Sequence, residues 1–501
     1  MSLIEFLDGH PYPDGETIVQ SDAGSLTLGE LRTRVDALAT AIREAGAEPG
    51  QAVGNLVTPG PSAVIVMFAA WRAGAVYTPV NNRFTAAEVT SLVAEAGLAL
   101  LVGTPRDLAA HPESGTAALA YEWEQGDTTA VSTIRSVDPE AYAPDVAVIS
   151  RTSGTTGKPK SVLLRHAGTT DAIDASLVKL RGRPGGPGGS PTARLNLIPV
   201  PLALWGAVWN TLFSFRAGFG VVLLDTFTAA KFARLVKEHS VRSTVLPPAM
   251  LSMLADDPAV TDLAPLRMVR SITAPLSAEV ARRFHAKFGI VVLNSYGQTE
   301  LGGEVVGWTA ADTREFGSAK LGAVGRPYPD IDLRIQREDG SPAQTGERGE
   351  ICVRSPFRMD GYARGNGSVD ESRFDADGFL RTGDLGHLDD DGFLWVSGRV
   401  SDMINRGGLK VFPDEVEEVL RAHPSVRDAG VAGVADQRLG EVPHAWIVSA
   451  DPPEDGELQA WCRSRLAPYK VPARFSVVRE LPRNDIGKLL RRELSAGGAT
   501  A

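Results

Sequence analysis

The chain has 501 residues, of which 51 are Lys or Arg and 61 are Asp or Glu, so its formal net charge is −10. With 43% hydrophobic and 22% charged residues it is typical of a soluble globular protein, and its length predicts two or three domains. A nucleic-acid partner needs a basic face, so the acidic balance argues against one. The two cysteines, Cys352 and Cys462, support neither a disulfide framework nor a metal cluster.

The sequence shows no targeting or membrane signal. Residues 1–8 have no basic region and no long apolar run, so we expect no signal peptide. The most apolar stretch, 63–77, contains Arg72 and is too short to span a bilayer. We therefore expect a cytoplasmic protein without a membrane partner.

Helix and strand patterns alternate in the N-terminal region. Apolar residues recur at helical spacing behind 27–30, the run 53–57 predicts a strand, 64–71 a helix, and 73–81 a turn into a buried strand. Such alternation predicts an α/β fold with a largely parallel sheet covered on both faces. The Gly- and Pro-rich segment 181–191 is expected to be a flexible surface excursion, and its role stays open.

The most informative stretch lies between the apolar runs 146–149 and 162–164, which predicts a loop between two strands. Glycines let the backbone approach an oxyanion closely, while hydroxyls and lysines add donors and positive charge, so the loop suits a polyphosphate. Its candidate binding residues are Thr152, Ser153, Gly154, Thr155, Thr156, Gly157, Lys158 and Lys160.

This loop is not a Walker A motif, which needs four residues between its first glycine and a Gly-Lys-Ser/Thr that opens a helix. Here only Thr155 and Thr156 separate Gly154 from Gly157, and Pro159 follows the lysine. For the loop taken alone, a hydroxyl-rich surface hairpin that binds nothing is the alternative.

A second motif, Tyr-Gly-Gln-Thr-Glu at 296–300, follows the apolar run 290–293 and so lies at the carboxyl end of a predicted strand. It supplies an aromatic face for a purine, a hydroxyl for phosphate and a carboxylate for Mg²⁺. Farther on, the pattern of glycine, aspartate and alternating apolar residues over 349–386 predicts a small β-rich subdomain. Within it, Asp384 is a carboxylate able to accept two O–H bonds.

In this order, the motifs resemble those of the adenylate-forming superfamily, and acyl-CoA synthetases in particular, from about residue 25 to residue 494. The resemblance implies a large N-terminal domain of layered α/β sheets with a β-rich subdomain, and a small, mobile α+β C-terminal domain. The expected domains are residues 1–398, which bind ATP and the acyl group, and residues 399–501.

The resemblance also implies roles for single residues. Asp384 would hold the ribose hydroxyls beside Arg399, and Glu300 would hold Mg²⁺. Lys488, in a motif similar to the family's Pro-Arg-x-x-x-Gly-Lys, would stabilise the charge that develops during adenylation. For this basic cluster taken alone, a solvated face is the alternative. The other expected nucleotide-binding and catalytic residues are Ala274, Pro275, Tyr296, Gly297 and Thr299.

The expected acyl pocket departs from the family's pattern. Ala203 stands where an aromatic or His residue is usual, and Ile272 and Thr273 replace two glycines. Added side chains should narrow the site or contribute a hydroxyl contact, which favours a short or aromatic acid. Trp205 shares a helix face with Trp209, and core packing is the alternative for both. The expected pocket residues are Ala203, Trp205, Ile272, Thr273 and Ser295.

The C-terminal region carries three further expectations. Ser401 occupies the position of the family's hinge, and Asp402 follows it. From 413 a helix is predicted, with apolar residues on one face and Asp414 and Glu417 largely opposite. The loop that flanks the pantetheine tunnel in similar synthetases is represented by Gly407, Gly408 and Lys410.

The activity that the resemblance implies has two steps. ATP·Mg²⁺ and a small carboxylic acid give an acyl-adenylate and pyrophosphate, and coenzyme A then displaces AMP. The expected cofactors are therefore ATP, Mg²⁺ and coenzyme A. One alternative is an enzyme that passes its product to a carrier protein or to an amine, including one that activates nitrite. A non-catalytic nucleotide-binding module is the other, and the oligomeric state stays open, a homodimer included.

Overall fold

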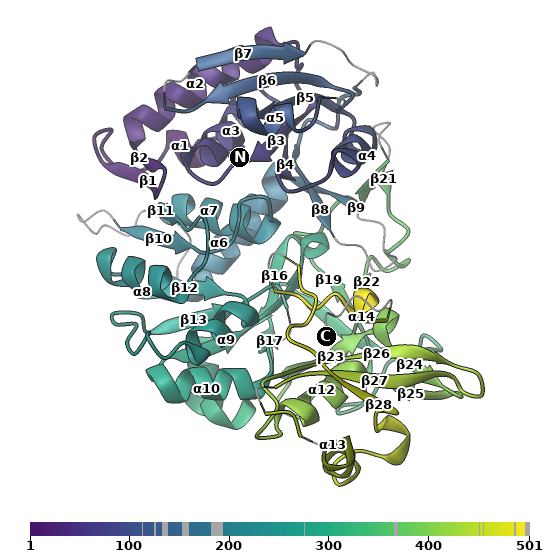
Figure 1. Cartoon of the computed structure of the whole chain (residues 1–501). Coiled ribbons are helices and arrows are strands. Elements are labelled where there is room, and N and C mark those ends of the chain that lie inside the picture. Colours follow the sequence, from purple (N-terminus) through teal and green to yellow (C-terminus); the bar gives the residue numbers. More distant parts are fainter. Residues whose placement is uncertain are drawn as a thin grey trace.

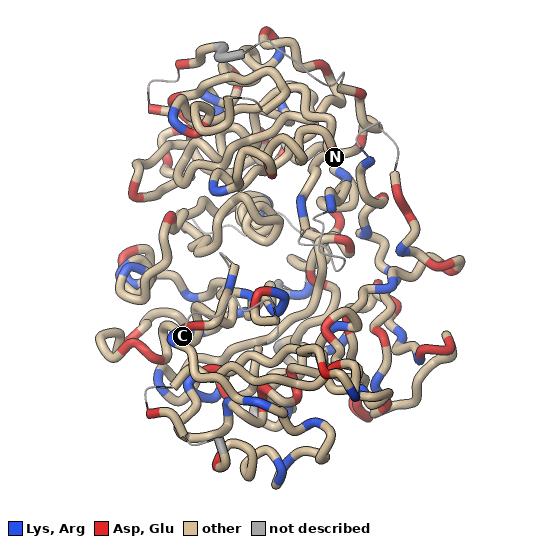
Figure 2. The backbone as a smooth tube through the Cα atoms, turned by 45° about the vertical axis from the view of Figure 1, so that its right-hand side comes forward, with Lys and Arg blue, Asp and Glu red and all other residues tan. Residues whose placement is uncertain are grey.

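The computed structural model describes residues 1–112, 114–124, 127–132, 139–152, 160–181, 194–274, 276–364, 369–449, 451–453, 455–484 and 487–495. Figure 1 shows a larger N-terminal part, built of several sheets with helices packed on them, and a smaller C-terminal part in green to yellow. Charged residues of both signs are spread over both parts (Figure 2). Within the described ranges, no helix is long and apolar enough to cross a membrane.

The largest sheet has nine strands, which lie in the order β21 (Val369–Asp370), β20 (Tyr362–Ala363), β9 (Lys160–Arg165), β8 (Val146–Thr152), β4 (Val76–Asn81), β3 (Ala52–Val57), β5 (Leu98–Gly103), β6 (Ala117–Glu122) and β7 (Asp127–Ser132). Its centre is parallel, as the sequence predicts: β3 pairs with β4 and β5, and β4 pairs with β8. Alternate residues of β3, such as Val53 and Leu56, belong to two separate hydrophobic clusters, so both faces of the sheet are covered.

The helices of this region are α1 (Glu5–Asp8), α2 (Leu28–Glu44), α3 (Pro61–Arg72), α4 (Ala86–Ala96), α5 (Pro105–Ala109) and α6 (His166–Arg181). The predicted helix behind 27–30 is α2, and it begins with a capping box in which Thr27 and Glu30 satisfy each other's backbone N–H groups. The Trp71 indole of α3 donates to the Ala147 carbonyl oxygen at 2.8 Å. This bond ties α3 to β8, the strand that leads into the predicted phosphate loop.

Two smaller sheets follow. One has the order β10 (Leu195–Ile198), β11 (Gly220–Leu223), β1 (Thr17–Ser21) and β2 (Gly24–Thr27), and the other is parallel, with β12 (Ser243–Leu246), β13 (Met268–Ser271) and β14 (Val291–Asn294). Their helices are α7 (Trp205–Arg216), α8 (Ala229–Glu238), α9 (Pro248–Asp256) and α10 (Ala278–Phe288). Because β13 and β14 run parallel, the segments that leave them at 272–274 and 295–300 lie at one edge of the sheet.

Antiparallel sheets complete the N-terminal part. A small one consists of β15 (Tyr296–Gln298), β16 (Gly303–Gly307) and β17 (Arg326–Pro327), with η1 (Thr299–Leu301), α11 (Ala310–Phe316) and η2 (Gly317–Lys320) nearby in the chain. The next contains β18 (Asp332–Gln336), β19 (Gly349–Arg354), β22 (Leu380–Leu388) and β23 (Leu394–Arg399). This second sheet confirms the predicted β-rich subdomain.

The C-terminal part has its own sheet, in the order β25 (Leu409–Val411), β24 (Ile404–Arg406), β27 (Gly440–Val448) and β26 (Asp428–Asp436), with β28 (Arg474–Val477) paired to β27. Its helices are η3 (Val400–Asp402), α12 (Pro413–Arg421), α13 (Asp455–Arg463), η4 (Pro468–Lys470) and α14 (Arg491–Ser495). Two hydrophobic clusters here contain only residues from Ile404 onward. A core of its own makes this part the small α+β unit that the sequence predicts.

Candidate active site

A buried carboxylate, Asp384, is the centre of the polar site in the N-terminal part. Its Oδ2 accepts from the Tyr296 hydroxyl at 2.9 Å and from Gln298 Nε2 at 2.6 Å, and its Oδ1 lies 2.9 Å from Arg399 Nε. Burial raises the pKa of Tyr296, and Asp384 raises it further. The same carboxylate raises the pKa of Arg399. Strands β15, β22 and β23 thus hold this carboxylate in a fixed position, which suits a ligand that carries two neighbouring hydroxyls.

The predicted phosphate loop joins β8 to β9, which pair antiparallel up to Thr152 and Lys160. Lys160 Nζ lies 4.5 Å from the centroid of the Tyr362 ring, and the Tyr362 hydroxyl donates to Glu300 Oε1 at 3.1 Å. The C-terminal end of the predicted loop, at Lys160, is therefore linked through Tyr362 to Glu300, the carboxylate expected to hold Mg²⁺. The loop residues themselves lie outside the described residues, namely Ser153, Gly154, Thr155, Thr156, Gly157 and Lys158.

Glu300 has the chemistry that Mg²⁺ requires of a protein ligand. Only one of its carboxylate oxygens receives a hydrogen bond among the described residues, that from Tyr362. Mg²⁺ is commonly held by one or two carboxylates together with waters and substrate phosphates, so a single carboxylate linked through Tyr362 to Lys160 fits the ion.

The other expected nucleotide residues surround the edge of β13 and β14. Ala274 follows β13, and Thr299 begins η1. A Cβ added to Gly297 would come within 2.0 Å of the Gly303 carbonyl oxygen, so the β15–β16 pairing requires glycine at this position. Pro275 lies outside the described residues.

The segment expected to line the acyl group has a strained backbone. Thr273 has φ +74°, a left-handed conformation that is rare for a β-branched residue. Thr273 thus has a backbone conformation that favours glycine, yet it carries a side chain. The side chains of Ile272 and Thr273 lie close to α7, because a Cβ added to Gly206 would be 3.8 Å from both Ile272 Cδ1 and Thr273 Cγ2. The Ser295 hydroxyl donates to the Ser271 carbonyl oxygen at 3.2 Å.

The two tryptophans of α7 are buried, each with 6% of its surface exposed. Trp209 stacks on Phe213 with ring centroids 5.4 Å apart, and a Cβ on Gly303 would lie 3.0 Å from Trp209 Nε1. Neither indole N–H of Trp205 or Trp209 has a hydrogen-bond partner among the described residues. Ala203, just before α7, packs partly buried against the main core.

Lys488 lies on a turn of the C-terminal part that touches the N-terminal part. The Gly487 N–H donates to the Asn484 carbonyl oxygen at 2.8 Å, and the Lys488 N–H donates to Asn484 Oδ1 at 2.9 Å. Gly487 has φ +76°, and a Cβ there would meet the Cβ of Ala249 at 2.1 Å. Only glycine allows the turn this approach to α9.

The charged groups around Lys488 come from both parts of the chain. Burial lowers the pKa of its ammonium, and Arg399 lowers it further, whereas Asp384 and Asp402 raise it. Arg491 also lowers it, by a smaller amount. The turn therefore brings a partly buried ammonium to the Asp384 site, where anionic phosphates would raise its pKa again.

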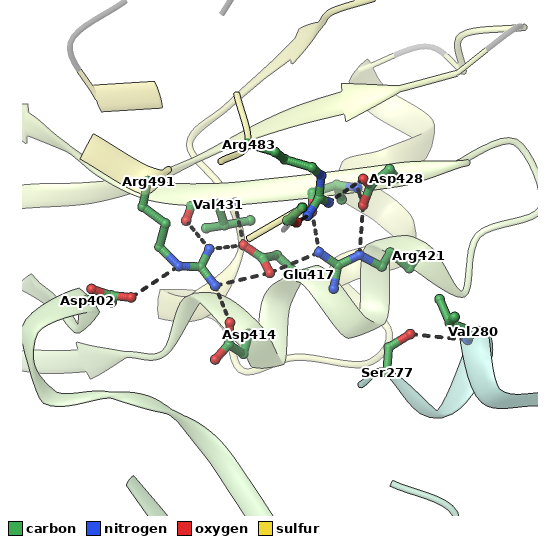
Figure 3. Close-up of polar contacts among 12 residues, drawn as sticks. Ser277, Val280, Asp402, Asp414, Glu417, Arg421, Asp428, Val431, Arg483 and Arg491 are labelled. Atoms are coloured by element: carbon green, nitrogen blue, oxygen red, sulfur yellow. Dashed lines mark hydrogen bonds and ion pairs between the residues drawn. The ribbon is translucent and has the colours of Figure 1, made fainter. Parts of the chain in front are cut away.

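Arg491, three residues after Lys488, anchors the turn to the rest of the C-terminal part. Its guanidinium forms ion pairs with Asp414 and Glu417 of α12 and lies 3.4 Å from Asp402 (Figure 3). Burial alone would raise the pKa of Glu417, but the neighbouring guanidinium of Arg491 holds it below its usual range. A buried ionised carboxylate thus fixes the chain on one side of Lys488.

A second ion pair fixes the chain on the other side of Lys488. Arg483, five residues before Lys488, lies 2.6 Å from Asp428, which also pairs with Arg421 at 3.1 Å (Figure 3). Arg421 in turn lies 3.1 Å from Glu417. The turn is therefore held at both ends by one continuous network of charges on α12 and β26.

The expected hinge lies next to this network through Asp402, whereas the expected coenzyme A residues lie on the β24–β25 hairpin. Ser401 and Asp402 form η3 with Val400, directly after β23, and the Ser401 hydroxyl donates to Asp402 Oδ1 at 3.0 Å. Lys410, in the β24–β25 hairpin, forms an ion pair with Glu338 of the N-terminal part. The hairpin turn contains Gly407 and Gly408, with φ +59° and +92°.

The sequence analysis did not find Arg491, Asp414 or Glu417 as functional residues. It placed the two acids opposite the apolar face of their helix, whereas Glu417 is only 2% exposed. The available signal was the spacing of Asp414, Glu417 and Arg421, which puts two acids and a base on one helical face. Their partner Arg491 lies 74 residues from Glu417, so spacing alone could not identify it.

Comparison with known proteins identifies the family. A family model described as AMP-binding enzyme matches residues 8–363, and one described as AMP-binding enzyme C-terminal domain matches residues 415–488. The chain belongs to this family of AMP-binding enzymes. It is an AMP-forming ligase, and the family's carboxylate–CoA ligases use ATP, Mg²⁺ and coenzyme A.

Three similar proteins use different acceptors. The chain is 33% identical to a 2-succinylbenzoate–CoA ligase of Bacillus licheniformis, over 96% of this chain and 97% of the relative. It is 31% identical to a fatty acid–acyl-carrier-protein ligase of Streptomyces coeruleorubidus, over 95% and 92%. An amide bond synthetase of Marinactinospora thermotolerans superposes with a TM-score of 0.84 at 29% identity, over 99% of both chains.

The lowered pKa of Lys488 predicts a loss of adenylation at alkaline pH. Its charged form is the one that can stabilise the transition state, so kcat/KM for ATP should fall as pH rises through a pKa below the usual lysine range. ATP–pyrophosphate exchange across pH 7 to about 10.5 measures this. The variant Lys488→Arg, weaker overall, should lose this alkaline fall because its guanidinium stays protonated. A wild-type profile flat throughout that range would contradict the prediction.

Replacing Arg491 by lysine should misplace Lys488 without removing the positive charge. A lysine ammonium cannot bridge Asp414, Glu417 and Asp402 as the guanidinium fork does, so we expect adenylation to fall by about tenfold to a hundredfold. ATP affinity should change little, because Asp384 and its donors Tyr296 and Gln298 lie in the N-terminal part.

The matched control is Arg492→Lys, at the exposed neighbouring position, which should keep wild-type exchange. Calorimetric ATP binding and a thermal melt separate misplacement from unfolding. Equal loss in both variants, or loss of ATP binding in the Arg491 variant alone, would show that the network does not act through Lys488.

Proposed function

We propose that this protein activates a small carboxylic acid with ATP to give an acyl-adenylate, and then transfers the acyl group to the thiol of coenzyme A. The observation that carries the proposal is the approach of the Lys488 turn to the Asp384, Tyr296 and Arg399 site. A nucleotide-binding module without catalysis has no need for a buried ammonium held in place from a second domain by a network of ion pairs.

In the first half-reaction the carboxylate attacks the α-phosphorus of ATP and pyrophosphate leaves. Asp384 would accept the ribose hydroxyls, with Arg399 beside it, and the loop from Thr152 to Lys160 would surround the phosphates. Lys488 would stabilise the negative charge that develops between the carboxylate and the α-phosphate. Glu300 would hold Mg²⁺, which neutralises charge on the phosphates when bound.

In the second half-reaction we propose that the C-terminal domain, residues 399–501, turns about Ser401 and Asp402. Such a turn would withdraw Lys488 and bring the β24–β25 hairpin, with Gly407 and Gly408, to the acyl-adenylate. The segregation of the two hydrophobic cores on either side of η3 supports a boundary at residues 398 and 399. Backbone rotation of a few residues is enough for such a hinge.

Two other acceptors compete with coenzyme A. Relatives of comparable identity carry the names of a carrier-protein ligase and an amide bond synthetase, so a carrier thiol or an amine fits the same fold. The match to a 2-succinylbenzoate–CoA ligase over 97% of that relative supports coenzyme A as the acceptor. Thr273 and Ile272, in place of the two glycines of the resembled motif, support a short or aromatic acid.

The test is pyrophosphate release from ATP·Mg²⁺ with a panel of short and aromatic carboxylic acids and nitrite, each with and without coenzyme A. We expect release with one acid class, and faster AMP formation when coenzyme A is added. Release that coenzyme A does not accelerate would overturn the choice of acceptor and point to a carrier protein or an amine. No release with any acid, from protein that binds ATP, would overturn the ligase proposal.

A further inference from the structure

The surface formed by α7, β13 and β16 is apolar at one end and basic at the other. Beside the nucleotide site, Ile272 lies against Gly206. Two residues earlier, the Arg270 guanidinium lies over the ring of Phe213, 6.0 Å from its centroid. Gly206 and Phe213 are seven residues apart and so share one face of α7. The apolar end near Ile272 is therefore followed by a basic end, roughly 7 Å farther along the strand.

The basic end contains one complete ion pair. Arg270 Nη1 lies 3.1 Å from Glu304 Oε2, and both side chains are mostly buried, with 16% and 14% exposed. The other oxygen of Glu304 accepts a hydrogen bond from the Tyr328 hydroxyl. A Cβ on Gly307 would meet both Tyr328 and Glu304, so β16 has glycine where this group packs. Glu304 is thereby occupied at both oxygens.

Lys179 of α6 stands at the same end without such a partner. Its ammonium lies over the ring of Tyr328, and no carboxylate of the described residues forms an ion pair with it. Burial lowers its pKa to about 7, Glu304 and Asp330 raise it, and Arg270 lowers it. A partly buried ammonium that forms no ion pair among the described residues is stabilised when a ligand supplies a negative charge in contact with it.

We propose that Lys179 and Arg270 receive a second anionic group at the far end of the acid substrate, so that the substrate class is a dicarboxylic acid. This rests on the proposed ligase function, because it names the acid which that site activates. One carboxylate would be adenylated beside Thr273 and Lys488, and the other would pair with Lys179.

The charges at the basic end favour a substrate whose distal group is an anion over one whose distal group is cationic or apolar. A positively charged tail would face both Lys179 and Arg270, and Glu304 already accepts a hydrogen bond at each of its oxygens. An apolar tail would leave the partly buried Lys179 ammonium without an ion pair among the described residues, at a cost that a bound carboxylate removes. The Arg270–Glu304 pair, fixed by Tyr328, keeps the guanidinium in position for the incoming group.

The experiment compares matched acids that differ only in the distal carboxylate: glutarate with pentanoate, adipate with hexanoate, and terephthalate with para-toluate. Pyrophosphate release gives kcat/KM for each acid in wild type and in Lys179→Met. We expect wild type to prefer a diacid to its partner, and the variant to lose about tenfold to a hundredfold on the diacid alone. Lys179→Arg should restore part of the preference. The control Lys237→Met, at an exposed lysine of α8, should match wild type.

The pH dependence gives a second readout. The ratio of kcat/KM for diacid over monoacid cancels contributions common to both, such as that of Lys488. As Lys179 loses its proton above a pKa of about 7, this ratio should fall in wild type and stay level in Lys179→Arg.

A wild type that prefers the monoacids, or a Lys179→Met variant that loses activity equally on both acids, would overturn the inference while the ligase function stands. No pyrophosphate release with any of the acids would instead contradict the proposed ligase function. The KM for ATP, unchanged in Lys179→Met, verifies that the variant is folded and binds nucleotide.

Discussion

The arrangement of this enzyme depends on a buried guanidinium, Arg491, and the carboxylates that surround it. Asp414 and Glu417 hold it from α12, and Asp402 holds it from the segment expected to be the hinge. Burying such charges is costly unless all of them are paired, and removing one partner from a buried pair commonly costs about 3–5 kcal/mol. Because Lys488 is three residues from Arg491, these ion pairs also restrict the position of its ammonium beside Asp384 and Arg399.

The packing around the site depends on close approaches that leave no room for larger side chains. Gly487 meets Ala249 where the turn touches α9. On the N-terminal side, Gly297 allows the backbone of β16 to lie against β15. At Thr273 a side chain is present although the backbone has a left-handed conformation that favours glycine. Strain of about 1–3 kcal/mol at such a position persists only where the surroundings enforce it, and such strain gathers at ligand sites.

Much of the fold and of the site could be predicted from the sequence, because local patterns carry them. The apolar runs around the phosphate loop predicted the β8–β9 connection, and the alternation of strands and helices predicted the parallel sheet. The motif at 296–300 and Asp384 were expected at one site, and the structure joins them through the Tyr296 hydroxyl.

The charged clusters could not be predicted, because their members are far apart in the chain. Arg491 meets Glu417 across 74 residues, and Arg270 meets Glu304 across 34. In sequence, Glu417 is an ordinary acidic residue on the polar side of a helix, and Lys179 an ordinary base. Only the packed structure shows that Glu417 is buried and that Lys179 stands over Tyr328. Motifs alone therefore left the identity of the acid open.

The central claim is that Lys488 acts on the adenylation step and not on nucleotide binding. The most direct measurement is ATP–pyrophosphate exchange by Lys488→Ala beside wild type, with ATP affinity measured by calorimetry on the same preparations. The account predicts that exchange falls by about a hundredfold or more while the Kd for ATP stays within a few-fold of wild type. Exchange that persists near the wild-type rate, from a variant with intact ATP binding, would contradict it.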